Sequence, residues 1–323
     1  MGKKKELSIK YDKIIVYETN LQKLIVDKLI ETDVEPEKAL DSTLLIDARN
    51  NQIRIEDDVY HINVGGLRWT IKSACDLSKF PKLRTKELIG THFTGLNCRI
   101  FEALIDYDTL SIIDDGIGTP ALLRNERFVR TYDWLLRFVC AYILILLTRF
   151  RRIKSVKYLL NNASRYYTIY SFIDKDYARC LNDVDVIHLS FFESMHITKI
   201  QKGIAGYIGS GANKFRKECL EYVTQRHQRL IYFPHPREVV DDFVSHFAEE
   251  IIRPTQTIES YFSEHGIPEY LYGDMSSVFL NLKLSGVNTS LVVFSFVGLD
   301  DTYCKIYKEN GIDVLYIADI IKS

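Results

Sequence analysis

Residues 204–236 read IAGYIGSGANKFRKECLEYVTQRHQRLIYFPHP and hold a complete strand–helix–strand unit. The apolar run 204–208 ends in glycines, which is typical of a buried strand and the turn after it. A helical pattern covers 215–225, and a second apolar run covers 229–233. Because a helix of about ten residues crosses back between the two runs, we predict that the two strands pair in parallel.

The same alternation continues to the end of the chain. We predict a mainly helical segment at 241–250, helices at 257–265, 276–284 and 302–310, and strands at 269–272, 290–297 and 313–317. Strands that alternate with helices are typical of a doubly wound sheet, in which ligands bind at the carboxyl ends of the strands.

The first half of the chain shows the same rhythm with longer insertions. We predict strands at 13–17, 42–48, 86–93 and 110–113, a helix capped by Thr19-Asn20, an extra hairpin within 53–63, and a mostly helical segment at 121–161. Segments 167–173 and 184–191 are typical of strands or of a linker between the halves. The economical interpretation is an α/β protein of two doubly wound domains, 1–190 and 191–323, that face each other across a cleft.

The composition is that of a folded protein without a strong charge preference. Its 323 residues are 46% hydrophobic and 26% charged, with a formal net charge of −1, so no global field favours nucleic acid. The six cysteines are scattered and form no C-x-x-C pair, which argues against a zinc ribbon or a disulfide framework and favours a reducing cytosol. No H-E-x-x-H, EF-hand or Walker pattern indicates a metal site.

The apolar segments predict a cytoplasmic protein. The N-terminal MGKKKELSIKYD lacks an apolar core, so we expect no secretory signal. The longest nearly uncharged run, Phe138–Thr148, is too short to span a bilayer as a helix. Five basic residues follow it: Arg149, Arg151, Arg152, Lys154 and Lys157. They indicate either a solvated basic helix or a reversible contact with an anionic inner-membrane surface.

Two adjacent carboxylates, Asp114 and Asp115, follow the strand predicted at 110–113. In a poorly solvated cleft both cannot ionise freely, so we expect one pKa to rise, which suits a general base. The alternative is structural: one aspartate caps the next helix, and Gly116 supplies a turn with positive φ.

His235 follows the strand predicted at 229–233 and lies between Pro234 and Pro236. The two prolines restrict the local backbone and fix where the imidazole points. A histidine is the natural acid near neutral pH. A histidine on an ordinary surface loop would have the same signature, so both interpretations stay open.

Ser276 and Ser277 open the helix predicted at 276–284. Serine is a common N-cap, and a helix N-terminus also binds anions, so these hydroxyls indicate either a cap or a phosphate site. Gly209 and Gly211 would let a ligand approach the backbone closely, although the G-x-G-x-x-G order of a dinucleotide loop is absent. An acid–base pair and a phosphate site on two βα-repeating halves predict transfer of a group from a phosphorylated donor.

The order of these motifs, D-D-G, then H-P, then Ser-Ser, resembles that of the bacterial sialyltransferases. The strings YFPHPRE (232–238), TIESYF (257–262) and SSVFLNLK (276–283) resemble glycosyltransferase family 52, which includes lipooligosaccharide and capsule sialyltransferases. The resemblance is strongest in the C-terminal part of the chain. In the N-terminal half it rests on the opening strand, the TNLQ segment and IDDGIGT.

The family implies a GT-B-type fold of two Rossmann-like domains, the first on the acceptor side and the second binding the CMP-sugar. It further implies CMP-sialic acid as donor, a galactose-terminated acceptor on a bacterial surface glycan, an inverting α-2,3 transfer, and neither cofactor nor metal. Asp114 or Asp115 would be the base, and His235 would assist the departing phosphate.

The resemblance also assigns the binding residues. Ser276 and Ser277 would bind the phosphate, and Glu259 matches an acidic position that holds the cytidine or ribose. Without the resemblance, Glu259 has the pattern of an exposed helix charge. The remaining positions would be Gly209, Gly211 and Pro236 on the donor side and Asn20 and Gln22 on the acceptor side.

Two alternatives stay open. A transferase that uses CMP-Kdo or another CMP-nonulosonate would share the cytidine and phosphate contacts. A non-catalytic glycan-binding protein would share the fold, but the intact D-D-G and H-P motifs argue against it. Neither the acceptor nor the oligomeric state, monomer or homodimer, follows from the sequence.

Overall fold

The computed structural model divides the chain into two compact units, 1–189 and 190–323. It describes residues 9–32, 42–48, 52–55, 58–61, 75–77, 79–90, 96–114, 116, 118–124, 139, 143, 154, 156–174, 177, 184–192, 196–210, 214–236, 238–295 and 301–322. The assignment of the first unit to the acceptor and the second to the donor stays a prediction, as does their arrangement across a cleft.

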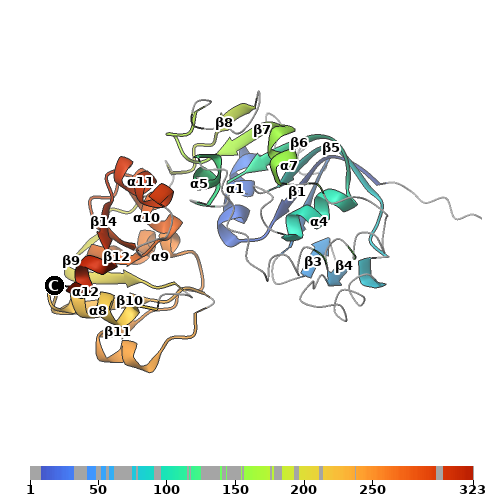
Figure 1. Cartoon of the computed structure of the whole chain (residues 1–323). Helices are drawn as coiled ribbons and strands as arrows, with labels where there is room; N and C mark the ends of the chain where they lie inside the picture. The colour runs from blue at the N-terminus through green and yellow to red at the C-terminus, as the bar shows by residue number, and fades with distance from the viewer. Residues whose placement is uncertain are drawn as a thin grey trace, which may run out of the picture. The chain divides into compact units, whose positions relative to one another are not determined.

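In the described part of the first unit, eight strands form one sheet with the order β4-β3-β2-β1-β5-β6-β7-β8 (Figure 1). Its parallel strands are β1 (Ile9–Tyr17), β2 (Thr43–Asp47), β5 (Leu83–Gly90), β6 (Asp106–Ile113), β7 (Ala163–Thr168) and β8 (Asp185–His188). At one edge, β3 (Gln52–Ile55) and β4 (Asp58–His61) form an antiparallel hairpin. The hairpin predicted within 53–63 is therefore confirmed.

The first unit also contains helices α1 (Asn20–Glu31), α4 (Leu96–Leu104), α5 (Gly118–Arg124) and α7 (Val156–Asn161). α1 begins with a capping box, because the Thr19 hydroxyl accepts the Gln22 N–H at 3.1 Å and Gln22 Oε1 accepts the Thr19 N–H at 3.1 Å. Ile25, Val26 and Leu29 repeat at helical spacing and form the buried face of this helix.

The described sheet of the second unit has six parallel strands in the order β11-β10-β9-β12-β13-β14. They are β9 (Ile200–Ile208), β10 (Arg229–Phe233), β11 (Glu250–Ile251), β12 (Ile267–Asp274), β13 (Ser290–Ser295) and β14 (Asp313–Tyr316). Its helices are α8 (Arg216–Thr224), α9 (Ile258–His265), α10 (Ser277–Leu284), α11 (Asp301–Glu309) and α12 (Ile317–Lys322), with a 3-10 helix at Asp242–His246.

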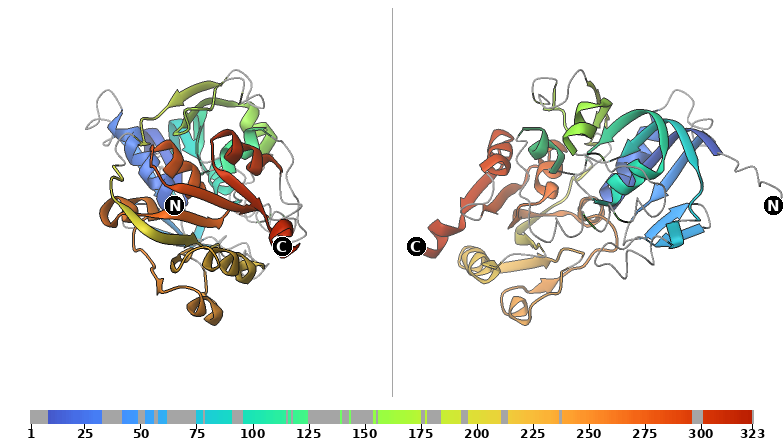
Figure 2. Two further views of the ribbon diagram at one scale, coloured as in Figure 1. Left: turned by 90° about the vertical axis from the view of Figure 1, so that its left-hand side faces the viewer. Right: turned by 45° about the vertical axis from the view of Figure 1, so that its right-hand side comes forward.

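The side-chain alternation of these strands builds two different faces. On one face Tyr207, Tyr232 and Phe294 form a stack, with the Tyr207 and Tyr232 rings 5.6 Å apart and 12° from parallel. This face packs against α8 and the C-terminal α12, which contact each other (Figure 2). On the opposite face Phe233 meets Phe262 of α9 at 5.2 Å. The polar groups at the strand ends therefore stand on a rigid, close-packed core.

The α/β prediction with two doubly wound sheets is confirmed, and the strand at 229–233 has the bounds predicted for it. The segment predicted to be mainly helical, 241–250, is helical over half of its length, because a 3-10 helix covers Asp242–His246 and the edge strand β11 begins at Glu250. The sequence patterns did not predict α4 or α12. Of the helical segment predicted at 121–161, α5 covers the start and α7 the end, and most of the residues between lie outside those described.

Candidate functional site

The sheet of the second unit has a topological switch point between β9 and β12. The chain runs from β9 through β10 to β11 on one side and returns to β12 on the other side of β9. Ligands of doubly wound sheets bind outside the carboxyl ends of the strands at such a point. The segments that follow β9, β10 and β12 carry Gly209, His235 and Ser276, so the fold brings these predicted site residues to one edge of one sheet.

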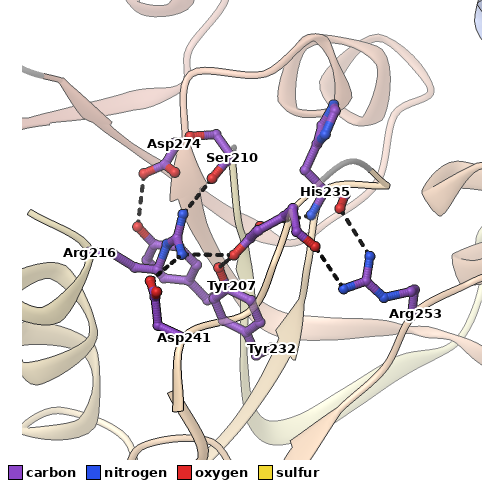
Figure 3. Close-up of polar contacts among 9 residues, drawn as sticks. Tyr207, Ser210, Arg216, Tyr232, His235, Asp241, Arg253 and Asp274 are labelled. Carbon is purple, nitrogen blue, oxygen red and sulfur yellow. Dashed lines mark hydrogen bonds and ion pairs between the residues drawn. The ribbon is translucent and has the colours of Figure 1, made fainter. Parts of the chain in front are cut away.

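His235 lies on a turn whose backbone is held from two sides. Its carbonyl accepts the Glu238 N–H at 2.8 Å, and its own N–H donates to Glu238 Oε2 at 2.9 Å. Arg253 donates to the carbonyls of His235 at 3.3 Å and Glu238 at 3.0 Å. His235 is exposed, and its imidazole points away from Arg253 and from Arg216 (Figure 3). A fixed backbone thus presents an exposed imidazole.

The Glu238 carboxylate is the centre of a buried polar cluster. It is 1% exposed, accepts the Tyr232 hydroxyl at 2.5 Å and pairs with Arg216 at 2.9 Å. The guanidinium of Arg216 also donates to the Ser210 carbonyl at 2.5 Å and to Asp241 at 3.1 Å (Figure 3). Burial, and then the Glu238 carboxylate, raise the pKa of Tyr232, so this hydroxyl stays protonated and donates. The cluster connects the turn after β9 with the turn after β10.

Gly209 is explained by this cluster. A Cβ on Gly209 would lie 2.2 Å from the Tyr232 hydroxyl and 2.4 Å from Glu238 Oε2, which is too close for any side chain. Only glycine therefore leaves room for the two hydrogen-bonded groups at the end of β9. Binding of the donor by Gly209 stays a prediction, and Gly211 lies outside the described residues.

Ser276 is the N-cap of α10. Its hydroxyl accepts the Val278 N–H at 3.4 Å, and its carbonyl accepts the Tyr307 hydroxyl at 2.9 Å. The capping interpretation of Ser276 is therefore confirmed. The first turn of α10 holds no acidic residue, so its N–H groups and the hydroxyl of Ser277 form an end that favours an anion.

Glu259 is not the exposed helix charge that its sequence pattern allowed. It lies in the first turn of α9, is 6% exposed, and accepts the Asn281 side-chain N–H of α10 at 2.8 Å. Burial raises the pKa of this carboxyl, while the hydrogen bond from Asn281 opposes the rise. The side chain thus joins the N-terminal turn of α9 to α10.

Asp274 ends β12 directly ahead of the Ser276 cap. It is 2% exposed and accepts the Tyr207 hydroxyl at 2.9 Å. Four charged residues near these strand ends were missed by the sequence interpretation: Arg216, Glu238, Arg253 and Asp274. Arg216, Arg253 and Asp274 are single charges outside the quoted motifs, whereas Glu238 ends the string YFPHPRE (232–238). The place of Glu238 in that string and the charge that closes β12 were the available signals.

In the first unit, Asp114 follows β6 and is fully buried. Its Oδ2 accepts the Ile169 N–H at 2.7 Å, and its Oδ1 accepts the hydroxyl of Tyr166. Burial, and then the Asp114 carboxylate, raise the pKa of Tyr166 well above its ordinary value. Gly116 has φ of 62°, so the predicted turn with positive φ is confirmed, whereas Asp115 lies outside the described residues.

The two residues predicted to contact the acceptor lie at the start of α1, beyond the carboxyl end of β1. Gln22 is 1% exposed, and its oxygen accepts the N–H groups of Glu18 at 2.5 Å and Thr19 at 3.1 Å. The capping box therefore accounts for Gln22, while Asn20 is exposed as the first residue of the helix. Contact of either residue with an acceptor stays a prediction.

The basic segment is described in part. The Lys154 ammonium pairs with the buried Glu102 carboxylate at 2.8 Å and donates to the Tyr107 hydroxyl at 2.8 Å, so this charge is engaged within the protein. Arg149, Arg151 and Arg152 lie outside the described residues. None of the described helices is long and apolar enough to cross a bilayer. Within the same residues, no three His, Cys, Asp or Glu side chains are grouped as metal ligands.

The sequence matches no protein-family model and no curated protein. The structure is similar to the crystal structure of an α/β-galactoside α-2,3-sialyltransferase from the luminous marine bacterium Photobacterium phosphoreum. The TM-score is 0.55 at 13% sequence identity, and the match covers 97% of this chain and 100% of that one. This likeness shows the fold: the chain has a GT-B-type architecture of two Rossmann-like units.

Proposed function

We propose that the protein is an inverting glycosyltransferase that moves sialic acid from CMP-sialic acid to a galactose-type hydroxyl of a bacterial surface glycan. One observation carries the proposal. The motifs that resemble those of the bacterial sialyltransferases all lie within two residues of the end of a parallel strand: Asp114 after β6, His235 after β10 and Ser276 after β12. The full-length similarity to a solved sialyltransferase supports the same activity and an α-2,3 linkage.

Asp115 is the proposed base, because Asp114 is already occupied. Both oxygens of the buried Asp114 accept hydrogen bonds, from Tyr166 and from the Ile169 N–H, which holds this carboxylate in place. These hydrogen bonds hold Asp114 in place, directly before Asp115 in the chain. Asp115 takes the proton of the acceptor hydroxyl as the oxygen attacks the anomeric carbon.

The leaving group is CMP. The bond between the anomeric carbon and the phosphate oxygen breaks on the face opposite the attack, so the anomeric centre inverts. The exposed imidazole of His235 donates to the departing phosphate, and Ser276, Ser277 and the N-terminal N–H groups of α10 bind it. Glu259, in the first turn of α9, faces the nucleoside and accepts from the ribose hydroxyls.

The deciding experiment mixes the full-length protein with CMP-sialic acid and lactose and follows both CMP release and the new sialoside by mass spectrometry. We expect both products in equal amounts. Lactose remaining unmodified while a matched reaction with CMP-Kdo gives product would assign the other sugar. If neither donor yields product over a panel of galactose-terminated acceptors while CMP still binds, the protein is a glycan-binding homologue.

A further inference from the structure

We infer that Glu238 and Arg216 are positioning residues for His235, acting through the backbone of its turn. This inference rests on the proposed function, since it assigns both side chains to the same reaction. The imidazole points away from Arg216 (Figure 3), and the contacts of Glu238 with His235 are made to its backbone N–H and carbonyl. They fix the backbone position of His235 and thereby the point from which its imidazole extends.

Glu238 closes the turn through two hydrogen bonds to the backbone of His235. Its N–H donates to the His235 carbonyl at 2.8 Å, and its carboxylate returns to the His235 N–H at 2.9 Å. The same carboxylate accepts the Tyr232 hydroxyl at 2.5 Å and forms an ion pair with Arg216 at 2.9 Å. A carboxylate accepts on both oxygens and donates on neither, so it can satisfy all three donors at once. No other ionisable or amide side chain of this size can do so.

Arg216 fixes the carboxylate to a second strand end. It is 6% exposed and joins Glu238 to the Ser210 carbonyl after β9, at 2.5 Å. Stability alone does not explain such a pair, because well-packed apolar residues in place of a buried ion pair are often as stable or more so. The geometry of the pair gives a reason for its presence. One planar guanidinium contacts the turn after β9 and the turn after β10 and holds the two turns together.

The surroundings fit a rigid support. Gly209 lacks the Cβ that would strike Tyr232 and Glu238, and Arg253 holds the outer carbonyls of the turn. The core beneath is the stacked face of Tyr207 and Tyr232. A support of this kind matters for transfer, because displacing a reacting group by about 1 Å can cost about 100-fold in rate.

Glu238→Gln tests the inference selectively. Glu238 Oε1 accepts the Tyr232 hydroxyl and forms the ion pair with Arg216, whereas Oε2 accepts the His235 N–H. The single oxygen of glutamine should therefore stay with Tyr232 and Arg216 and turn its NH2 toward the His235 N–H. The variant keeps the shape and the arginine contact but loses the tie to the turn.

Three measurements follow from this design. The His235 amide should exchange with deuterium faster in Glu238→Gln, read by NMR, while kcat falls about 10- to 100-fold and KM for CMP-sialic acid changes less than about threefold. Glu249→Gln is the matched control, because Glu249 is 56% exposed and pairs with Arg229 at 2.8 Å on the surface. It should leave all three quantities unchanged.

A double-mutant cycle separates positioning from general structural damage. If Glu238 acts through His235, Glu238→Gln should lower kcat no further in a His235→Ala protein. Arg216→Lys keeps the charge, but a lysine cannot reach both Glu238 and Ser210. We therefore expect Arg216→Lys to lower kcat as Glu238→Gln does, and to lower it no further in a His235→Ala protein. An additive loss in the cycle, or unchanged exchange at His235, would overturn the inference while wild-type transfer stands. If the wild type transfers nothing, the proposed function fails, and the exchange experiment still decides whether the pair holds the turn.

Discussion

At the scale of single residues, the neighbours Asp114 and Asp115 have different tasks in our proposal. Asp115→Asn should lower kcat about 100-fold or more, since it removes the base, and should leave unfolding by urea unchanged. Asp114→Asn should instead lower the free energy of unfolding by about 1–3 kcal/mol, because an NH2 group replaces one of the two accepting oxygens and then faces either the Tyr166 hydroxyl or the Ile169 N–H. Initial rates and urea titrations of both variants measure this; full activity in Asp115→Asn would reject it as the base.

The two serines of α10 allow a separate test of the donor site. Ser276→Ala and Ser277→Ala should each weaken CMP binding by about 1–3 kcal/mol, because each removes a hydroxyl at the helix end that we propose as the phosphate site. Ser285→Ala, at the other end of the same helix, is the matched control and should bind CMP as the wild type does. Calorimetric titration with CMP gives the affinities. Equal affinities in all four proteins would leave Ser276 with its capping role alone.

At the scale of elements, Glu259 connects α9 and α10, and its burial makes the ionised form of the carboxyl unfavourable for stability. Burial raises the pKa of its carboxyl above the ordinary 4.5, so the folded protein favours the protonated form. The stability that this group contributes is complete below pH 4.5 and is lost as the pH rises through its folded pKa. Glu259→Gln keeps the oxygen that accepts from Asn281 and never ionises.

We therefore predict that Glu259→Gln is more stable than the wild type at pH 8 and that this advantage disappears near pH 4.5. In our proposal the same variant should also bind CMP more weakly, because the one oxygen of glutamine accepts from Asn281 and the other carboxyl oxygen, proposed to accept from the ribose, is lost. Thermal unfolding across this pH range and titration with CMP measure the two effects. A stability difference that does not depend on pH would mean that the carboxyl titrates normally and that burial does not perturb it.

Elements with strong local patterns were predictable from the sequence, and those defined by tertiary contacts were not. β10 is a short apolar run between polar segments, and its bounds were predicted. β11 is two exposed residues, Glu250 and Ile251, that pair with β10 and carry no alternation of their own. α12 packs on α8, and this tertiary contact, which the local sequence pattern does not contain, stabilises it as a helix.

At the scale of the whole molecule, the motifs were readable but the supports around them were not. Asp114, His235 and Ser276 lie within two residues of the ends of strands, so periodicity placed them at strand ends. The turn that carries His235 is supported by Glu238 and Arg253 directly and by Arg216 through Glu238. These three residues are spread over 38 positions of the sequence, and the fold brings them together. Such contacts depend on strand order and register, which single-sequence patterns do not define.

At the same scale, the proposed transfer should persist in EDTA. The leaving CMP carries a single phosphate, so no second phosphate must be bridged by a divalent cation. The charge that develops on it can be met by the His235 imidazole and the N–H groups that open α10. Rates measured with EDTA, with magnesium and with manganese should agree within about twofold. Complete loss on chelation, restored by either metal, would mean that a carboxylate at the end of β6 holds a cation, and the acid–base roles assigned to Asp115 and His235 would then have to be withdrawn.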